Sequence, residues 1–85
     1  MPYTTYILKS TTTKRLYIGQ TNNLQDRLRR HNAGLVPATR RERPWVLVSH
    51  ETHPMRSMAV QRERYLKSLK NPQYILKTIC RGPVA

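Results

Sequence analysis

The sequence predicts an α+β fold in which one small sheet is flanked by a few helices, in the order β-β-α-β-α-α. Two short stretches rich in Thr, Tyr and Ile lie near the N-terminus, and a third strand-like run follows at residues 45–48. Between and after these runs, apolar residues recur at helical spacing. A chain of 85 residues buries only about 60–65% of its unfolded surface, so we expect residues 1–85 to form a single domain.

The first two predicted strands form an antiparallel hairpin. Residues 3–9 and 15–20 supply the strands, and the polar residues 10–14 supply the turn between them. If the turn centres on Thr11-Thr12, Tyr6 and Tyr17 face each other across the hairpin, although the pattern leaves the register open.

The first predicted helix follows the hairpin directly. Residues 21–23, Thr21-Asn22-Asn23, offer three candidate N-caps. Leu24 and Leu28 are spaced i, i+4 and form the apolar stripe of the helix. Gly34 is placed to end the helix in the left-handed conformation.

The remaining elements are a basic loop, a third strand, a connector, the longest helix and a short final helix. Their predicted ranges are 35–43, 44–49, 50–54, 55–70 and 73–80. Pro44 marks the start of the third strand, and Asn71-Pro72 breaks the longest helix.

The charge of the chain favours a polyanionic partner. Sixteen Lys and Arg against four Asp and Glu give a net charge of +12, which repels itself unless a partner neutralises it. The cations run through the whole chain, so a folded nucleic-acid-binding surface is favoured over a disordered arm. A merely soluble cationic surface is the alternative. The candidate nucleic-acid-binding residues are Arg15, Arg30, Arg40, Arg41, Arg43 and Lys67.

The cysteine count and hydropathy predict a protein of a reducing compartment. Cys80 stands alone and has no internal disulfide partner; we expect it on the final helix. No apolar run is long enough to span a bilayer, and the N-terminal residues lack the pattern of a secretory signal. We therefore expect a cytoplasmic protein without a membrane partner.

Two pairs of residues could carry chemistry. Arg27 and His31 are four residues apart on one predicted helix, so we expect their Cβ atoms to lie about 6 Å apart on the same face. This spacing places a permanent cation beside an imidazole, a group that titrates near neutral pH. A solvated basic helix face is the alternative. Tyr6 and Tyr17 could activate water through one of their phenols, or could be a cross-strand packing pair worth about 0.2–1 kcal/mol.

Glu63 is the acid best placed for catalysis. The other three acids, Asp26, Glu42 and Glu51, lie beside basic residues, in a loop or in a connector, whereas Glu63 lies inside a helix at the edge of its apolar face. It could form an i, i+4 salt bridge with Lys67, worth about 0.3–0.5 kcal/mol. It could instead bind one divalent cation such as Mg²⁺, which takes one or two carboxylates and completes its shell with water and phosphate oxygens.

These residues fall in a recognisable order. Tyr6 lies in Thr4-Thr5-Tyr6, residues 17–19 read Tyr-Ile-Gly, Arg27 and His31 follow on the next helix, and Glu63 lies in the later helix. The chain therefore resembles the GIY-YIG endonuclease domain, particularly its small single-domain bacterial members, from residue 3 to about residue 79. Tyr17-Ile18-Gly19 matches the second motif literally, and the first motif keeps only its tyrosine.

The resemblance implies a fold, a cofactor and a set of roles. The fold is a three-stranded antiparallel sheet flanked by helices, and the activity is metal-dependent hydrolysis of phosphodiester bonds in DNA. Glu63 would hold Mg²⁺ or Mn²⁺, and Arg27 would stabilise charge on the scissile phosphate. Tyr17 would act as general base or orient water, while Tyr6 and His31 would orient groups or share protons.

Two other classes of function stay open at this point. A non-catalytic nucleic-acid-binding module could retain the same fold, and it would need the basic surface but neither Glu63 nor a cation. A protein-interaction subunit could instead meet an acidic protein partner with its positive charge.

Overall fold

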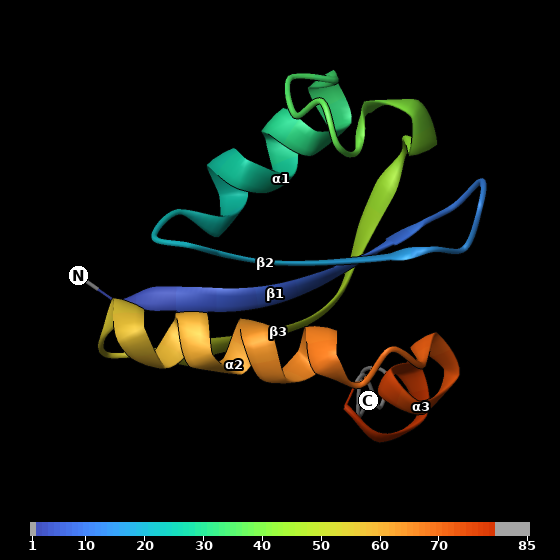
Figure 1. Cartoon of the computed structure of the whole chain (residues 1–85). Helices are drawn as coiled ribbons and strands as arrows, with labels where there is room; N and C mark the ends of the chain where they lie inside the picture. Colours follow the sequence, from blue (N-terminus) through green and yellow to red (C-terminus); the bar gives the residue numbers. More distant parts are fainter. Residues whose placement is uncertain (1, 80–85) are drawn as a thin grey trace, which may run out of the picture.

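The computed structural model describes residues 2–79 as a three-stranded antiparallel sheet with helices on both faces (Figure 1). The order of the strands in the sheet is β2-β1-β3. The elements are β1 (Tyr3–Ser10), β2 (Leu16–Thr21), α1 (Leu24–Ala33), the 3₁₀ helix η1 (Arg40–Glu42), β3 (Trp45–His53), α2 (Arg56–Ser68) and α3 (Pro72–Thr78). The predicted fold class and the β-β-α-β-α-α order are confirmed.

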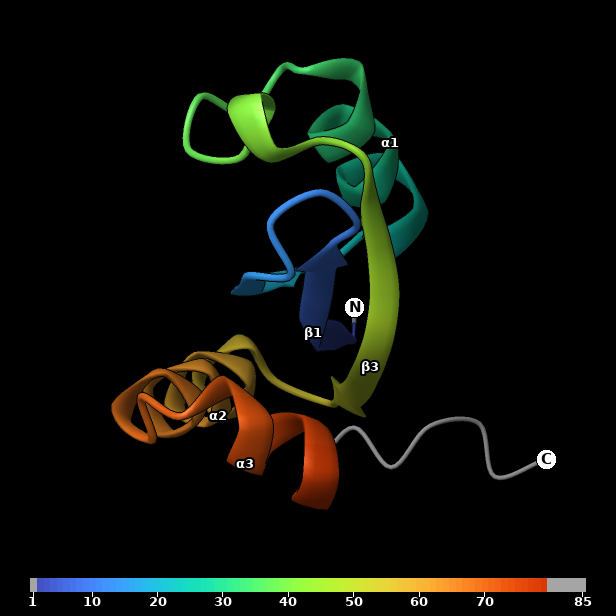
Figure 2. The same ribbon diagram turned by 90° about the vertical axis from the view of Figure 1, so that its right-hand side faces the viewer.

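The helices divide between the two faces of the sheet. Helix α1 and η1 lie on one side, and α2 and α3 lie on the other, as the two perpendicular views in Figures 1 and 2 both show. Because β1 is the central strand, it is covered on both faces, and residues 5–8 are all buried. No helix among residues 2–79 combines the length and the apolar character needed to cross a membrane.

The hairpin register differs by two residues from the facing tyrosine pair that a turn at Thr11-Thr12 predicts. Tyr6 pairs with Gly19, and Leu8 pairs with Tyr17. The connection lies one residue later in the chain than expected, because Ser10 N donates to Arg15 O at 2.9 Å and so moves the centre of the turn toward the C-terminus. A shift of two residues preserves the side-chain alternation, so both tyrosines still lie on the same face of the sheet.

The third strand is longer than predicted. β3 pairs with β1 along its whole length, from Tyr3 opposite His53 to Ser10 opposite Trp45, with an irregularity between Ile7 and Leu8. The expected connector at 50–54 is therefore largely strand. The sequence did not predict this part of the strand because its residues are polar. Polar side chains are tolerated there because β3 is an edge strand.

The helix ends follow the predicted chemistry with small changes in range. Among the three candidates, Asn23 caps α1 by accepting from Asp26 N at 3.1 Å, and Gly34 ends it with φ 80°. Asn71 caps α3 by accepting from Tyr74 N, so residues 71–72 start that helix as well as separating it from α2. Cys80, expected on the final helix, lies outside the described residues.

Candidate active site

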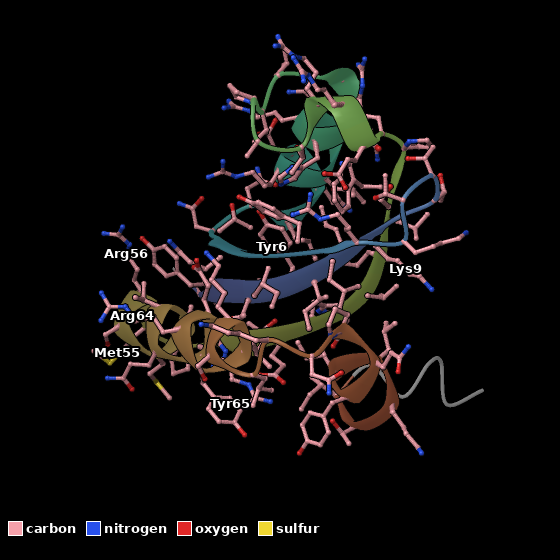
Figure 3. The ribbon with its side chains drawn as sticks, turned by 45° about the vertical axis from the view of Figure 1, so that its right-hand side comes forward. Tyr6, Lys9, Met55, Arg56, Arg64 and Tyr65 are labelled. Atoms are coloured by element: carbon pink, nitrogen blue, oxygen red, sulfur yellow. The ribbon has the colours of Figure 1, made fainter. Side chains whose placement is uncertain are left out.

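A buried hydrogen bond between Tyr6 and His31 forms the centre of the candidate site. Tyr6 comes from the central strand β1 and His31 from the last turn of α1, and both side chains are almost fully buried. Tyr6 Oη lies 3.1 Å from His31 Nε2. Figure 3 shows Tyr6 on the side of the sheet that α1 covers. Tyr6 and His31 are 25 positions apart in the sequence. They meet because the side-chain alternation of β1 directs Tyr6 toward α1 and because His31 lies on the side of α1 that packs on the sheet.

Thr39 holds the other nitrogen of this imidazole. The Thr39 hydroxyl lies 2.8 Å from His31 Nδ1 and 3.3 Å from the carbonyl oxygen of Val36, which can only accept. Both contacts are hydrogen bonds only if Thr39 donates to Val36 and accepts from His31 Nδ1–H. In the neutral imidazole, Nε2 then carries the lone pair, and the Tyr6 hydroxyl donates to it.

Sequence reasoning missed Thr39, which is buried in the basic loop. Trp45 Nε1 donates to the Thr39 carbonyl oxygen at 2.8 Å, so the first residue of β3 fixes the backbone at this position. Thr39 is eight residues after His31 in the sequence, and the chain between them turns back through irregular backbone so that the two side chains meet. A contact of this kind follows no helix or strand period, so no spacing pattern indicated it.

Burial keeps both members of the Tyr6–His31 pair neutral near pH 7. Burial, followed by the nearby charge of Arg27, lowers the pKa of His31. Burial also raises the pKa of the Tyr6 phenol, with Tyr17 adding to the rise, Arg27 opposing it and Glu63 adding to it. The Tyr6 phenol is therefore a proton donor to the imidazole rather than a ready base.

Tyr17 is the more accessible phenol of the two. Its ring meets the His31 ring edge-on at 4.8 Å between centroids and lies 6.4 Å from the Tyr6 ring. Tyr17 is only partly buried, whereas Tyr6 is 2% exposed. The cross-strand tyrosines thus pack together, as one alternative predicted, and also leave one phenol within reach of solvent.

Gly19 makes room for the Tyr6 hydroxyl. A Cβ at this position would lie 2.6 Å from Tyr6 Oη and 2.7 Å from Tyr6 Cζ. The phenol cannot move away cheaply, because it is buried and hydrogen-bonded to His31. The Tyr17-Ile18-Gly19 motif therefore has a steric reason here, and the Tyr6 hydroxyl lies over β2, the edge strand of the sheet.

Arg27 and Glu63 come from opposite layers. Arg27 lies on α1, one turn before His31, and Glu63 lies on α2, across the sheet. Both charges nevertheless act on the Tyr6 phenol, in opposite directions. The structure places Arg27 and Glu63 on opposite sides of the sheet rather than on one face.

Glu63 forms the salt bridge that its spacing allows. Its Oε2 lies 2.7 Å from Lys67 Nζ, and its side chain is 21% exposed. The other three acids also pair with cations: Asp26 with Arg29 and Arg30, Glu42 with Arg15, and Glu51 with Arg62. Pairing alone therefore does not distinguish Glu63, but its influence on the Tyr6 phenol does.

The six candidate nucleic-acid-binding residues are all exposed, and most of them lie near α1. Arg30 is on α1, Arg40 and Arg41 are in η1, and Arg43 follows η1. Arg15, in the hairpin turn, is tied to η1 through its ion pair with Glu42. Lys67 alone lies on α2, on the other side of the sheet.

The comparisons with known proteins agree with this geometry. The model of the GIY-YIG catalytic domain, a nuclease-type domain, matches residues 2–75. The chain therefore belongs to the GIY-YIG family, whose members are generally endonucleases and interact with nucleic acid, and the resemblance read from the sequence is confirmed.

One solved structure is similar over nearly the whole chain. It is the solution NMR structure of the UPF0213 protein BH0048 from Bacillus halodurans, at 25% identity and a TM-score of 0.59. The likeness covers 99% of this chain and 89% of that one. No curated protein matches the sequence.

Proposed function

We propose that this protein is a metal-dependent endonuclease that hydrolyses phosphodiester bonds in DNA. The observation that carries the proposal is the buried, neutral Tyr6–His31 pair beside the accessible Tyr17 phenol. The cation of Arg27 on α1 influences the pKa of both members of this pair, and the carboxylate of Glu63 on α2 influences the pKa of Tyr6. A packing role alone would not require such an arrangement of donors, acceptors and charges.

The proposed roles follow from what each group can do. Hydrolysis adds water across a P–O bond, so a base must take a proton from water and the leaving oxygen must gain one. Tyr17, as the reachable phenol, orients or deprotonates the water. Arg27 stabilises the charge that develops on the phosphate. Tyr6 and His31 form a fixed neutral pair that positions Tyr17 and can accept or return a proton at Nε2.

The donors around Glu63 suit a hard cation with few protein ligands. Residues 2–79 contain no group of three or more His, Cys, Asp or Glu placed to hold a metal ion. Mg²⁺ and Mn²⁺ can be held by one carboxylate together with water and phosphate oxygens. When bound, such a cation would polarise the phosphoryl oxygen and neutralise charge on the phosphate.

Two features of the described residues support this assignment. Gln20 alternates with Ile18 along β2 and so lies on the face covered by α2, and its buried Oε1 has no hydrogen-bond partner. Lys67, which holds one Glu63 oxygen, is 55% exposed and can exchange that carboxylate for a substrate phosphate. We propose Glu63 as the protein anchor, with the orphaned oxygen of Gln20 as a further donor on the same side of the sheet.

The test compares two acids on the same protein. Wild-type protein is incubated with linear and branched DNA in Mg²⁺, in Mn²⁺ and in EDTA, beside the variants Glu63→Ala and Glu51→Ala. We expect cleavage only with a divalent cation, its loss in Glu63→Ala, and its retention in Glu51→Ala, which removes the same charge elsewhere. DNA affinity measured in EDTA should hold or tighten slightly in both variants.

Two outcomes would contradict the proposal in different ways. Undiminished cleavage by Glu63→Ala would remove the metal assignment. DNA binding without cleavage across the whole panel would identify the protein as a non-catalytic nucleic-acid-binding module that retains the nuclease fold.

A further inference from the structure

An open pocket of about 350 Å³ lies along β2 on the face of the sheet that α2 and α3 cover, across the sheet from the Tyr6–His31 pair. Strand β2 forms one wall, and the end of α2 with the start of α3 forms the other. Its apolar lining is supplied by Leu16, Ile18, Leu66 and Ile75. The pocket was not indicated by the sequence, because β2 is far in the chain from the α2–α3 junction that forms the opposite wall.

The rim of the pocket is strongly basic. Arg15, Lys67 and Lys70 contribute to its lining, and no Asp or Glu is among the described residues that line it. An apolar interior with three cations at the mouth matches a ligand that has a flat apolar part and an attached anion. A nucleotide has this composition: the base is flat and poorly hydrated on its faces, and the phosphates on either side are anionic.

The pocket shares two residues with the candidate site and its surroundings. Tyr17 lines the pocket and also packs against His31. Lys67 lines the pocket and also pairs with Glu63, one turn away on α2. On the proposed function a phosphate lies at Glu63, one turn of α2 from Lys67 at the mouth of the pocket, so the next base of the strand comes near the pocket.

We propose that this pocket receives an unpaired nucleobase of the strand that the protein binds. This inference takes the position of the bound phosphate from the proposed function, on which it therefore rests. It adds the class of DNA that the protein prefers. The volume falls within the range of small-molecule sites and admits a base. A paired base must leave its stack before it can enter, whereas an unpaired base is free to do so. The preferred substrates are therefore single-stranded or branched DNA with unpaired nucleotides beside the bound phosphate.

The experiment separates base binding from backbone binding. A thymidine hexanucleotide and an abasic hexanucleotide of equal charge are titrated in EDTA at one salt concentration. We expect the wild-type protein to bind the base-bearing strand more tightly by about tenfold, the scale of one well-held base. In Leu16→Trp, which fills the pocket, this ratio should fall close to one. In Val46→Trp, which adds an indole at an exposed position on β3, the ratio should stay at the wild-type value.

A second measurement does not depend on any variant folding. Amide chemical shifts of wild-type protein are recorded with each hexanucleotide, and the differences between the two titrations should map to residues 16–18 and to the start of α3. A wild-type ratio near one, an unchanged ratio in Leu16→Trp, or differences that map elsewhere would overturn the pocket proposal. Because no metal is present, these results are independent of whether the protein cleaves DNA.

Discussion

The two faces of the sheet are built from different chemistry. The face under α1 packs leucines such as Leu8 together with aromatic and polar side chains. Directional hydrogen bonds join Tyr6, His31, Thr39 and Trp45 there. The face under α2 and α3 packs aliphatic side chains: Ile7, Ile18, Leu66 and Ile75. The side chains of β1 alternate between the two faces, so this one strand contributes residues to both hydrophobic cores.

This difference separates the sources of stability and of chemistry. Aliphatic packing is non-directional and scales with buried area, so the aliphatic side chains of the α2 face can stabilise the fold without themselves orienting a reactive group. Hydrogen bonds between buried polar groups specify one arrangement, and they are costly when one partner is lost. We therefore expect substitutions on the two faces to affect different measurements.

The largest expected effect on stability is at Leu66, in the α2 face. Leu66→Ala removes a side chain that is 1% exposed, and it should lower the free energy of unfolding by about 2–5 kcal/mol. This is a large share of the stability of a small domain. Denaturant unfolding measures the change.

A matched substitution on the other face sharpens the comparison. Leu28→Ala makes the same chemical change on α1, where the side chain is only partly buried, so it should cost less stability than Leu66→Ala. An equal cost at the two positions would contradict the assignment of stability to the α2 face.

Arg27→Ala should show the opposite pattern. We expect a loss of about 10²–10³-fold in the cleavage rate, the usual cost of removing one electrostatic stabiliser of a transition state, with little change in the midpoint of unfolding. Arg29→Ala is the control, because it removes the same charge from an exposed position on the same helix. Equal losses in the two variants would mean that general electrostatics, rather than a role at the phosphate, explains the effect.

Thr39→Val should perturb the α1 face through a single hydroxyl. The variant leaves His31 Nδ1–H without its partner, which should cost about 1–3 kcal/mol of stability. It should also shift the imidazole ¹⁵N resonances, because Thr39 no longer selects the tautomer. Thr39→Ser keeps the hydroxyl and should restore both measurements. Unchanged imidazole resonances in Thr39→Val would remove the positioning role of this residue.

The contrast between Thr39 and Arg27 explains what could be predicted from the sequence. Local periodicity correctly placed Arg27 and His31 on one helix and put Tyr6 and Tyr17 on one face of the hairpin. These features depend on periods of 3.6 and 2, which are visible in a sequence. Thr39 reaches His31 through irregular backbone, which has no period.

The remaining differences also have physical reasons. The hairpin register depended on the position of the turn, and the polar side chains of the loop did not reveal that the backbone of Ser10 closes it by bonding to Arg15. The second half of β3 is polar, yet it is held in the sheet by backbone pairing with β1. That Arg27 and Glu63 lie on opposite sides of the sheet is a tertiary property that no local pattern contains.

The smallest expected effect is a pH dependence of stability from His31. Its pKa is lowered in the folded protein, chiefly by burial, whereas an unfolded histidine titrates near 6.5. Below about pH 6.5 the unfolded chain therefore binds a proton that folded His31 does not. Stability should fall as the pH drops through this value, by at most about 1.4 kcal/mol per pH unit, until folded His31 is itself protonated. Unfolding measured between pH 7.5 and 5.5 should lose this component in His31→Gln and keep it in His50→Gln, which alters an exposed histidine on β3. A His31→Gln profile parallel to that of the wild type would mean that the imidazole titrates freely, and that the neutral Tyr6–His31 pair does not define the α1 face.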